Sequence, residues 1–157
     1  MTLQMEPIAT VRASRMQPED DFWGGTTATI QLNETLPADA LAGLSDFSHA
    51  EIVYVFDRVA PDKLESGARH PRNNRDWPRV GIFAQRAKGR PNRIGTTIVP
   101  ILAVQGRQLI VGELDAIDGT PVLDIKPVMR EFLPRTEVRQ PAWAGELMRD
   151  YWAPSRP

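Results

Sequence analysis

Proline and glycine interrupt this chain so often that long helices have little room to form. Fourteen prolines and eleven glycines are scattered through 157 residues. Proline lacks a backbone donor and clashes with the preceding helical turn, while glycine favours turns and bends. This punctuation predicts many short strands joined by turns.

Runs of β-branched and other apolar residues lie between these breaks and predict seven strands. They cover residues 8–12, 26–32, 49–59, 79–85, 96–104, 108–114 and 122–125. The run 52–56 is apolar throughout, as expected of a strand buried on both faces. Tight turns are expected at Gly106 and at Asp118-Gly119. Successive strands without alternating helices favour a mostly-β fold, closed into a single-domain barrel.

Two short helices and two loops complete the prediction. A helix is expected over residues 37–44, with Pro37 in its first turn, and a C-terminal helix over residues 141–152. Residues 16–25 and 60–77 are expected to form loops, and a loop as long as the second is often functional. No repeat or linker divides the chain. We therefore expect one domain over residues 1–157, with a core over about 5–135 and a helical tail over 136–157.

The composition sets limits on compartment and chemistry. The absence of cysteine excludes disulfides, thiolate nucleophiles and cysteine-based zinc sites. The longest apolar run, 98–104, is far shorter than the roughly 20 residues of a membrane-spanning helix. Residues 1–10 lack the pattern of a signal peptide. These features favour a cytoplasmic protein without a membrane segment.

Arginine is concentrated in one part of the chain. Between Arg69 and Arg93 lie seven arginines and Lys88, against the single acid Asp76. Guanidinium groups bind phosphates in two-point contacts and stack on flat rings, so the segment suits nucleic-acid or phosphate binding. A solvated loop whose arginines pair with acids elsewhere explains the same residues equally well.

Several common sites find no support in the sequence. There is no Gly-x-Gly-x-x-Gly turn and no Gly-x-x-x-x-Gly-Lys-Ser/Thr loop, so neither a Rossmann nor a P-loop nucleotide site is expected. There is no Gly-x-Ser-x-Gly elbow of a serine hydrolase. The two histidines, His49 and His70, are far apart, and no metal site is expected.

A second polar segment, residues 114–127, contains an Asp-Gly turn followed by charged positions on one strand. Asp124 and Lys126 are two residues apart, so they share a strand face. On the residues alone, a turn role explains Asp118 and Gly119 better than a ligand role. The residues alone thus predict a β-rich domain with a basic site rich in hydrogen-bond donors.

Together the two segments resemble the TsaA/TrmO-like family, also called YaeB-like or VirR, whose members methylate N6-threonylcarbamoyladenosine beside the anticodon of tRNA. The resemblance covers roughly residues 5–135. Its longest ordered strings are Arg90-Pro91-Asn92 with Ile94-Gly95, and Asp118-Gly119-Thr120-Pro121-Val122 with Asp124-Ile125-Lys126-Pro127.

The resemblance implies a β-barrel homodimer that binds S-adenosylmethionine near the subunit interface and takes tRNA as its substrate. It implies a cofactor site made of Asp57, Arg58, Arg86, Thr96, Asp118, Gly119, Thr120 and Pro121. Arg72, Arg79, Arg90 and Arg93 would face the nucleic acid or the modified base. Asp124 or Asp118 is the expected base, with Lys126 or an arginine holding the threonyl carboxylate.

Two stretches depart from the family pattern. Relatives carry Pro-Arg-Gln in the first loop, where this chain has residues 16–23, and His-Gln where Asp57-Arg58 stands. These departures leave open two other functions: methylation of a different acceptor, and a non-catalytic module that binds S-adenosylmethionine or a nucleotide.

Overall fold

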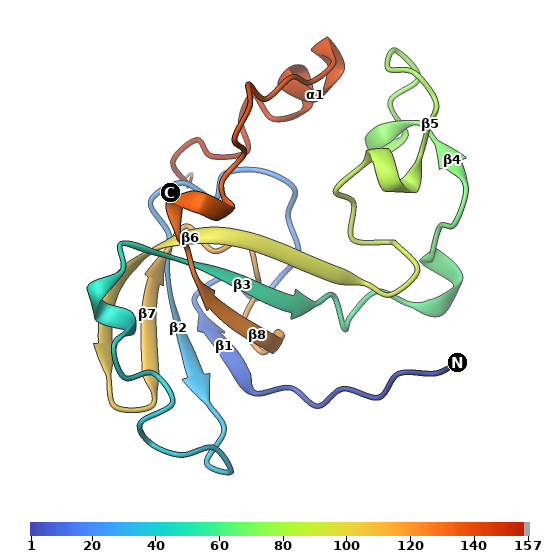
Figure 1. Cartoon of the computed structure of the whole chain (residues 1–157). Helices are drawn as coiled ribbons and strands as arrows, with labels where there is room; N and C mark the ends of the chain where they lie inside the picture. Colours follow the sequence, from blue (N-terminus) through green and yellow to red (C-terminus); the bar gives the residue numbers. More distant parts are fainter. Residues whose placement is uncertain (156–157) are drawn as a thin grey trace.

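A closed six-stranded barrel forms the body of the protein in the computed structural model, which describes residues 1–155 (Figure 1). The strand order is β1-β2-β7-β6-β3-β8, and every pair is antiparallel. The bounds are β1 Ala9–Ala13, β2 Thr27–Leu32, β3 His49–Val55, β6 Ile94–Gln105, β7 Gln108–Gly112 and β8 Pro121–Pro127. The predicted mostly-β barrel is therefore confirmed.

Short elements lie outside the barrel. They are β4 Ala68–Arg69, β5 Val80–Gly81, the 3-10 helices η1 Leu44–Asp46, η2 Pro61–Lys63, η3 Pro71–Asn73, η4 Ile82–Ala84 and η5 Arg130–Phe132, and the helix α1 Ala142–Leu147. Among residues 1–155, no helix has the length and hydrophobicity needed to cross a membrane.

The barrel interior is filled by alternate residues of each strand. In β3, Ala50, Ile52 and Tyr54 are buried, while Val53 and Val55 are only half-buried. The prediction that this run is buried on both faces was wrong, because a barrel wall has only one inward face. The turns predicted at Gly106 and Asp118-Gly119 are present, with φ of 58° at Gly106 and 84° at Gly119.

Two other predicted elements differ from the structure. The helix expected over 37–44 is a series of turns with i→i−3 hydrogen bonds, which end at Gly43 with φ 83° and bury Leu41. The strand expected over 79–85 shrinks to the two residues of β5, followed by η4. It lies off the barrel and pairs only with the two-residue β4, so nothing extends it.

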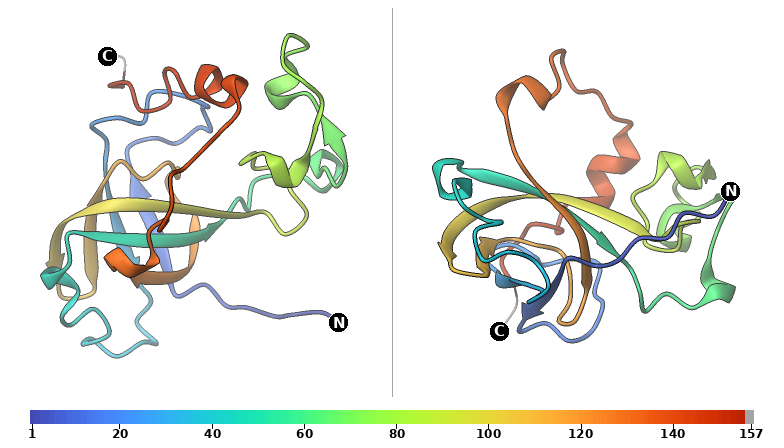
Figure 2. Two further views of the ribbon diagram at one scale, coloured as in Figure 1. Left: turned by 45° about the horizontal axis from the view of Figure 1, so that its top comes forward. Right: turned by 60° about the horizontal axis from the view of Figure 1, so that its bottom comes forward.

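Two segments stand over one end of the barrel. The segment carrying β4, β5 and η3 projects from the ends of β3 and β6, and α1 lies beside it (Figures 1 and 2). The Trp77 indole connects them by donating to the Glu146 carboxylate, 2.8 Å away. The predicted C-terminal helix is thus present but shorter, because residues 148–153 form turns.

Candidate functional site

The Asp115 carboxylate forms the centre of a polar cluster at this end of the barrel. It accepts hydrogen bonds from the hydroxyl groups of Tyr54 (3.1 Å), Thr97 and Tyr151. Tyr54 and Thr97 are buried barrel residues, whereas Tyr151 comes from the segment after α1. Burial, and then the negative charge of Asp115, raise the pKa of both tyrosines, so both phenols remain donors.

A glycine of β6 makes room for this cluster. A Cβ on Gly95 would lie 2.6 Å from the Tyr54 ring and 2.8 Å from the Phe56 ring. These two rings pack edge to face, with centroids 5.4 Å apart. Gly95, within the Arg-Pro-Asn-x-Ile-Gly string, therefore serves close packing at the base of the site.

Arg86 and Thr96, both predicted cofactor residues, lie together beside this cluster. The Arg86 guanidinium donates to the Thr96 carbonyl at 2.6 Å and to its hydroxyl oxygen at 3.4 Å. Its positive charge partly offsets the rise in the pKa of Tyr54 and Tyr151. The site thus contains one cation and one carboxylate, Arg86 and Asp115, close to buried hydroxyl groups.

The predicted cofactor turn forms a second part of the same barrel end. Arg58 donates to the carbonyls of Met16 (2.9 Å) and Asp118 (3.1 Å), and so joins the segment after β3 to the first loop and the turn. The Asp118 carboxylate accepts from the Ala13 amide at 3.0 Å. Arg58 and the turn are therefore brought together, and Asp118 itself holds the turn to β1.

The remaining predicted cofactor residues differ in exposure. The Thr120 hydroxyl is buried and donates to the Ile117 carbonyl at 2.7 Å. Pro121 begins β8 opposite Thr10 of β1. Asp57 is exposed at the end of β3. Thr120 and Pro121 thus shape the turn, while Asp57 is free to face a ligand.

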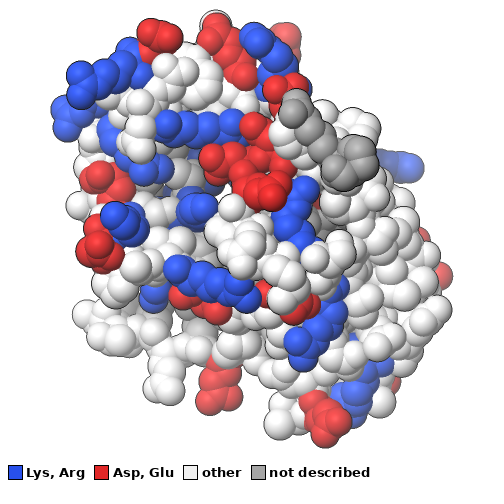
Figure 3. Space-filling model, turned by 180° about the vertical axis from the view of Figure 1, so that it is seen from behind, with Lys and Arg blue, Asp and Glu red and all other residues white. Residues whose placement is uncertain are grey.

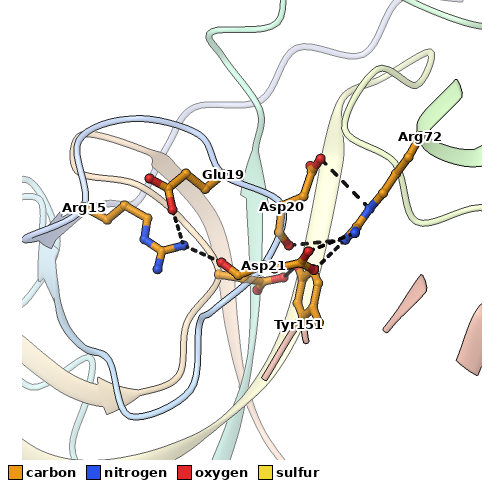
Figure 4. A network of polar contacts seen from close by, with 7 residues as sticks. Arg15, Glu19, Asp20, Asp21, Arg72 and Tyr151 are labelled. Atoms are coloured by element: carbon orange, nitrogen blue, oxygen red, sulfur yellow. Dashed lines mark hydrogen bonds and ion pairs between the residues drawn. The ribbon is translucent and has the colours of Figure 1, made fainter. Parts of the chain in front are cut away.

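The first loop is held by two arginines (Figure 4). Arg15 lies 3.8 Å above the Trp23 ring centroid and donates to the carbonyls of Asp21 and Phe22. Arg72 binds the Asp21 carboxylate in a two-point contact of 2.9 and 3.1 Å. A predicted nucleic-acid residue therefore anchors the loop that departs from the family pattern.

A cavity of about 560 Å³ lies between this loop and the barrel. Its lining combines both charges with aromatic surface, through Arg15, Glu19, Phe22 and Trp23. The Trp23 side chain is 4% exposed, and its indole N–H has no hydrogen-bond partner among the described residues. A buried donor without an acceptor is costly. Because this N–H is itself buried, the suitability of the cavity for a polar ligand comes from the charged side chains of Arg15 and Glu19 in its lining.

The other predicted nucleic-acid residues are of two kinds. Arg90 donates to the carbonyl of Gln85 (2.8 Å), and Arg93 to that of Val59 (3.0 Å), so both guanidiniums brace their own loops. Arg79 is exposed. On the face seen from behind, basic and acidic side chains are interspersed (Figure 3).

Asp124 and Lys126, the predicted catalytic pair, lie apart from this cluster. They form a 2.6 Å ion pair on the outer face of β8, opposite Val53 and Glu51 of β3. Hydrogen bonding to Asp124 raises the pKa of Lys126. Within residues 1–155, neither side chain hydrogen-bonds to Asp115 or its hydroxyl partners.

None of the three hydroxyl donors was predicted from the sequence, and no role was expected for Asp115. Asp115 lies within the second polar segment, residues 114–127, and that position was the available signal. Tyr54, Thr97 and Tyr151 are separated from it by 61, 18 and 36 residues, so only the fold brings them together. No three histidine or acidic side chains of the described chain are placed to hold a metal ion.

A barrel of this kind is found in solved structures of TrmO. A crystal structure of TrmO from Pseudomonas aeruginosa superposes with a TM-score of 0.73 and 26% identity, over 91% of this chain and 62% of that chain. The tRNA-methyltransferase O N-terminal domain family matches residues 12–132, and the chain belongs to this family.

Curated relatives agree with this assignment. The human tRNA (adenine(37)-N6)-methyltransferase is 34% identical over 119 residues, which are 76% of this chain and 26% of that protein. RcsF of Pseudomonas aeruginosa, named as a candidate S-adenosylmethionine-dependent methyltransferase, is 41% identical over 135 residues, 81% of this chain and 57% of that protein. The chain therefore spans less than two thirds of each of these relatives.

Proposed function

We propose that this protein is an S-adenosylmethionine-dependent methyltransferase that modifies N6 of the adenosine beside the anticodon of tRNA. Membership of the tRNA-methyltransferase O family is the observation that carries the proposal. The names of the human relative and of RcsF support the acceptor and the cofactor respectively. We further propose the threonylcarbamoyl form of that adenosine as acceptor, and the cytoplasm as location.

The residues at the barrel end fit such a cofactor chemically. A sulfonium cation is matched by the Asp115 carboxylate, and an amino-acid carboxylate by the Arg86 guanidinium. Arg58, Asp57 and the 118–121 turn lie at the same end of the barrel. The neighbouring cavity adds aromatic surface from Phe22 and Trp23 and the charged groups of Arg15 and Glu19. Bound there, S-adenosylmethionine would supply an electrophilic methyl group.

The chain's own contribution is positioning, because methyl transfer is an in-line displacement. Arg86 and Asp115 would fix the cofactor, and the exposed Arg79 would approach the phosphates of tRNA. Asp124 would accept the proton of the acceptor nitrogen, and Lys126 would hold the threonyl carboxylate. These two face outward from β8, so they can serve a site that a second subunit completes.

A homodimer explains how Asp124 and Lys126 can act with Arg86 and Asp115 although the two pairs lie apart in one subunit. Ile98 and Leu102 on the outer face of β6 are 49% and 55% exposed, and Phe132 is 87% exposed. Apolar side chains of this size on a surface favour association with another chain. In a two-fold dimer, the outer face of β8 in one subunit can lie against Arg86 and the Asp115 cluster of the partner subunit.

Subunit mixing tests this arrangement. Arg86→Ala and Asp124→Ala should each lower methyl transfer at limiting cofactor to a small fraction of the wild-type rate. An equal mixture should regain about a quarter of wild-type activity through mixed dimers with one intact site. Mixtures that stay inactive although a dimer forms would assign both residues to one subunit. A monomeric mass at micromolar concentration by light scattering would contradict the dimer.

Calorimetry tests the cofactor. We expect wild-type protein to bind S-adenosylmethionine and Arg86→Ala to bind it at least about tenfold more weakly, because a charge-assisted contact is lost. Arg130→Ala, an exposed arginine of η5 outside the site, is the matched control and should bind normally. No binding by the wild type would contradict the proposal.

A further inference from the structure

The segment after α1 lies along the first loop and is joined to it by backbone hydrogen bonds. Four backbone hydrogen bonds join them: the amides of Phe22, Trp23 and Gly24 donate to the carbonyls of residues 150, 151 and 153, and the Ser155 amide donates to Gly24. Their lengths lie between 2.8 and 3.3 Å. The C-terminal segment is therefore docked on its own subunit.

Gly24 shows that the chain is adapted to this docking. A Cβ on Gly24 would lie 2.1 Å from the Trp152 carbonyl oxygen, closer than any side chain permits. Gly24 is not among the glycines with positive φ, so its backbone conformation does not require glycine. The requirement comes from the close approach of the C-terminal segment.

The docked segment contributes to the Asp115 cluster and to the neighbouring cavity. The Tyr151 hydroxyl donates to Asp115 Oδ2, while Tyr54 and Thr97 donate to Oδ1, so each carboxylate oxygen has a protein donor. Ser155 lines the cavity next to the first loop. Without the segment, Oδ2 would lose its donor and the cavity would lose Ser155 from its lining.

We propose that residues 141–155 form a wall of the cofactor site supplied by the same subunit, and that Tyr151 is a positioning residue that orients Asp115. This inference rests on the proposed function and extends it. A carboxylate held by donors on both oxygens presents a fixed charge to a cationic group, and a covering segment excludes water from that contact.

Two variants separate docking from the hydroxyl contact. Gly24→Ala places a methyl group against Trp152 and undocks the segment without altering the Asp115 side chain. Tyr151→Phe keeps the segment docked and removes only the donor to Asp115. Gly145→Ala lies in α1, where a Cβ meets only Gln140 at 3.7 Å, and is the control.

Hydrogen exchange and calorimetry read out the two effects independently. We expect Gly24→Ala to expose the amides of Phe22 and Trp23 and to weaken S-adenosylmethionine binding about tenfold or more, comparable to losing a charge-assisted hydrogen bond. Tyr151→Phe should weaken binding while those amides stay protected. Gly145→Ala should change neither.

The outcomes distinguish this inference from the proposed function. If Gly24→Ala exposes the amides of Phe22 and Trp23 but binds the cofactor as tightly as the wild type, the segment is not a wall of the cofactor site. If Tyr151→Phe binds the cofactor as tightly as the wild type, Tyr151 is not a positioning residue. Amides that stay protected in Gly24→Ala would contradict the docking itself. Protected amides in a wild-type protein that binds no cofactor would instead refute the proposed function.

Discussion

The guanidinium of Arg72 and the carboxylate of Asp21 form a two-point ion pair across 51 residues of sequence, at 2.9 and 3.1 Å. Asp20 adds a weaker contact at 4.0 Å. The pair fastens the first loop to the segment that carries β4 and β5 (Figure 4). An arginine that the family resemblance assigns to the nucleic acid thus has an intramolecular partner in this chain.

The Arg72–Asp21 pair should contribute measurably to stability. Its side chains are only about a quarter exposed, so we expect a coupling energy of about 1 kcal/mol in a double-mutant cycle of Arg72→Ala and Asp21→Ala. Denaturant unfolding measures it. The Lys63–Asp62 pair, with both side chains 76% exposed, is the control and should show no coupling. Additive effects at Arg72 and Asp21 would disprove the pairing.

Gly95 should not tolerate a side chain. Gly95→Ala places Cβ against the Tyr54 and Phe56 rings, and overpacking of this kind costs about 1–3 kcal/mol of unfolding free energy. Thermal denaturation of Gly81→Ala provides the comparison, because a Cβ there meets nothing within 4 Å and φ is −60°. Equal melting temperatures for the two variants would contradict the packing described.

Stability should fall at alkaline pH. Tyr54 and Tyr151 have raised pKa values in the folded protein, so they keep their protons above pH about 10, where unfolded tyrosines lose theirs. The unfolded state then binds fewer protons, and the free energy of unfolding decreases as the pH rises. Tyr151→Phe should make this decrease shallower between pH 9 and about 11. Identical pH profiles for variant and wild type would argue against the cluster.

Asp124 should matter for catalysis and little for folding. Its ion pair with Lys126 is about half exposed, so Asp124→Ala should leave the melting temperature nearly unchanged. As the proposed general base it should lower the methyl-transfer rate about 100-fold or more. Glu51→Ala, on the neighbouring strand opposite Lys126, is the matched control. Full activity of Asp124→Ala would remove this residue from the mechanism.

The barrel was predictable because its strands carry local signals. Inward residues such as Ile52 and Val99 recur in runs rich in β-branched residues, and Gly106 and Gly119 mark the turns that the structure contains. The helix predicted over residues 37–44 was wrong because proline followed by alanine and leucine fits the start of a helix as well as it fits consecutive turns.

The site was only partly predictable, because its contacts join distant parts of the chain. Arg86 and Thr96 are ten residues apart, on either side of the Arg90–Gly95 string that carries the family resemblance. Tyr151 and Asp115 meet through the docking of the C-terminal segment, and no local pattern records that pairing. The same applies to Arg72 and Asp21, where an arginine-rich segment indicates binding but not which acid it binds.

Transfer of labelled methyl from S-adenosylmethionine to tRNA, with and without the threonylcarbamoyl group on the adenosine beside the anticodon, tests the central claim most directly. We predict label on the modified tRNA and none on the unmodified tRNA. Label on neither, from a protein that binds the cofactor, would contradict the proposed activity and favour a binding module.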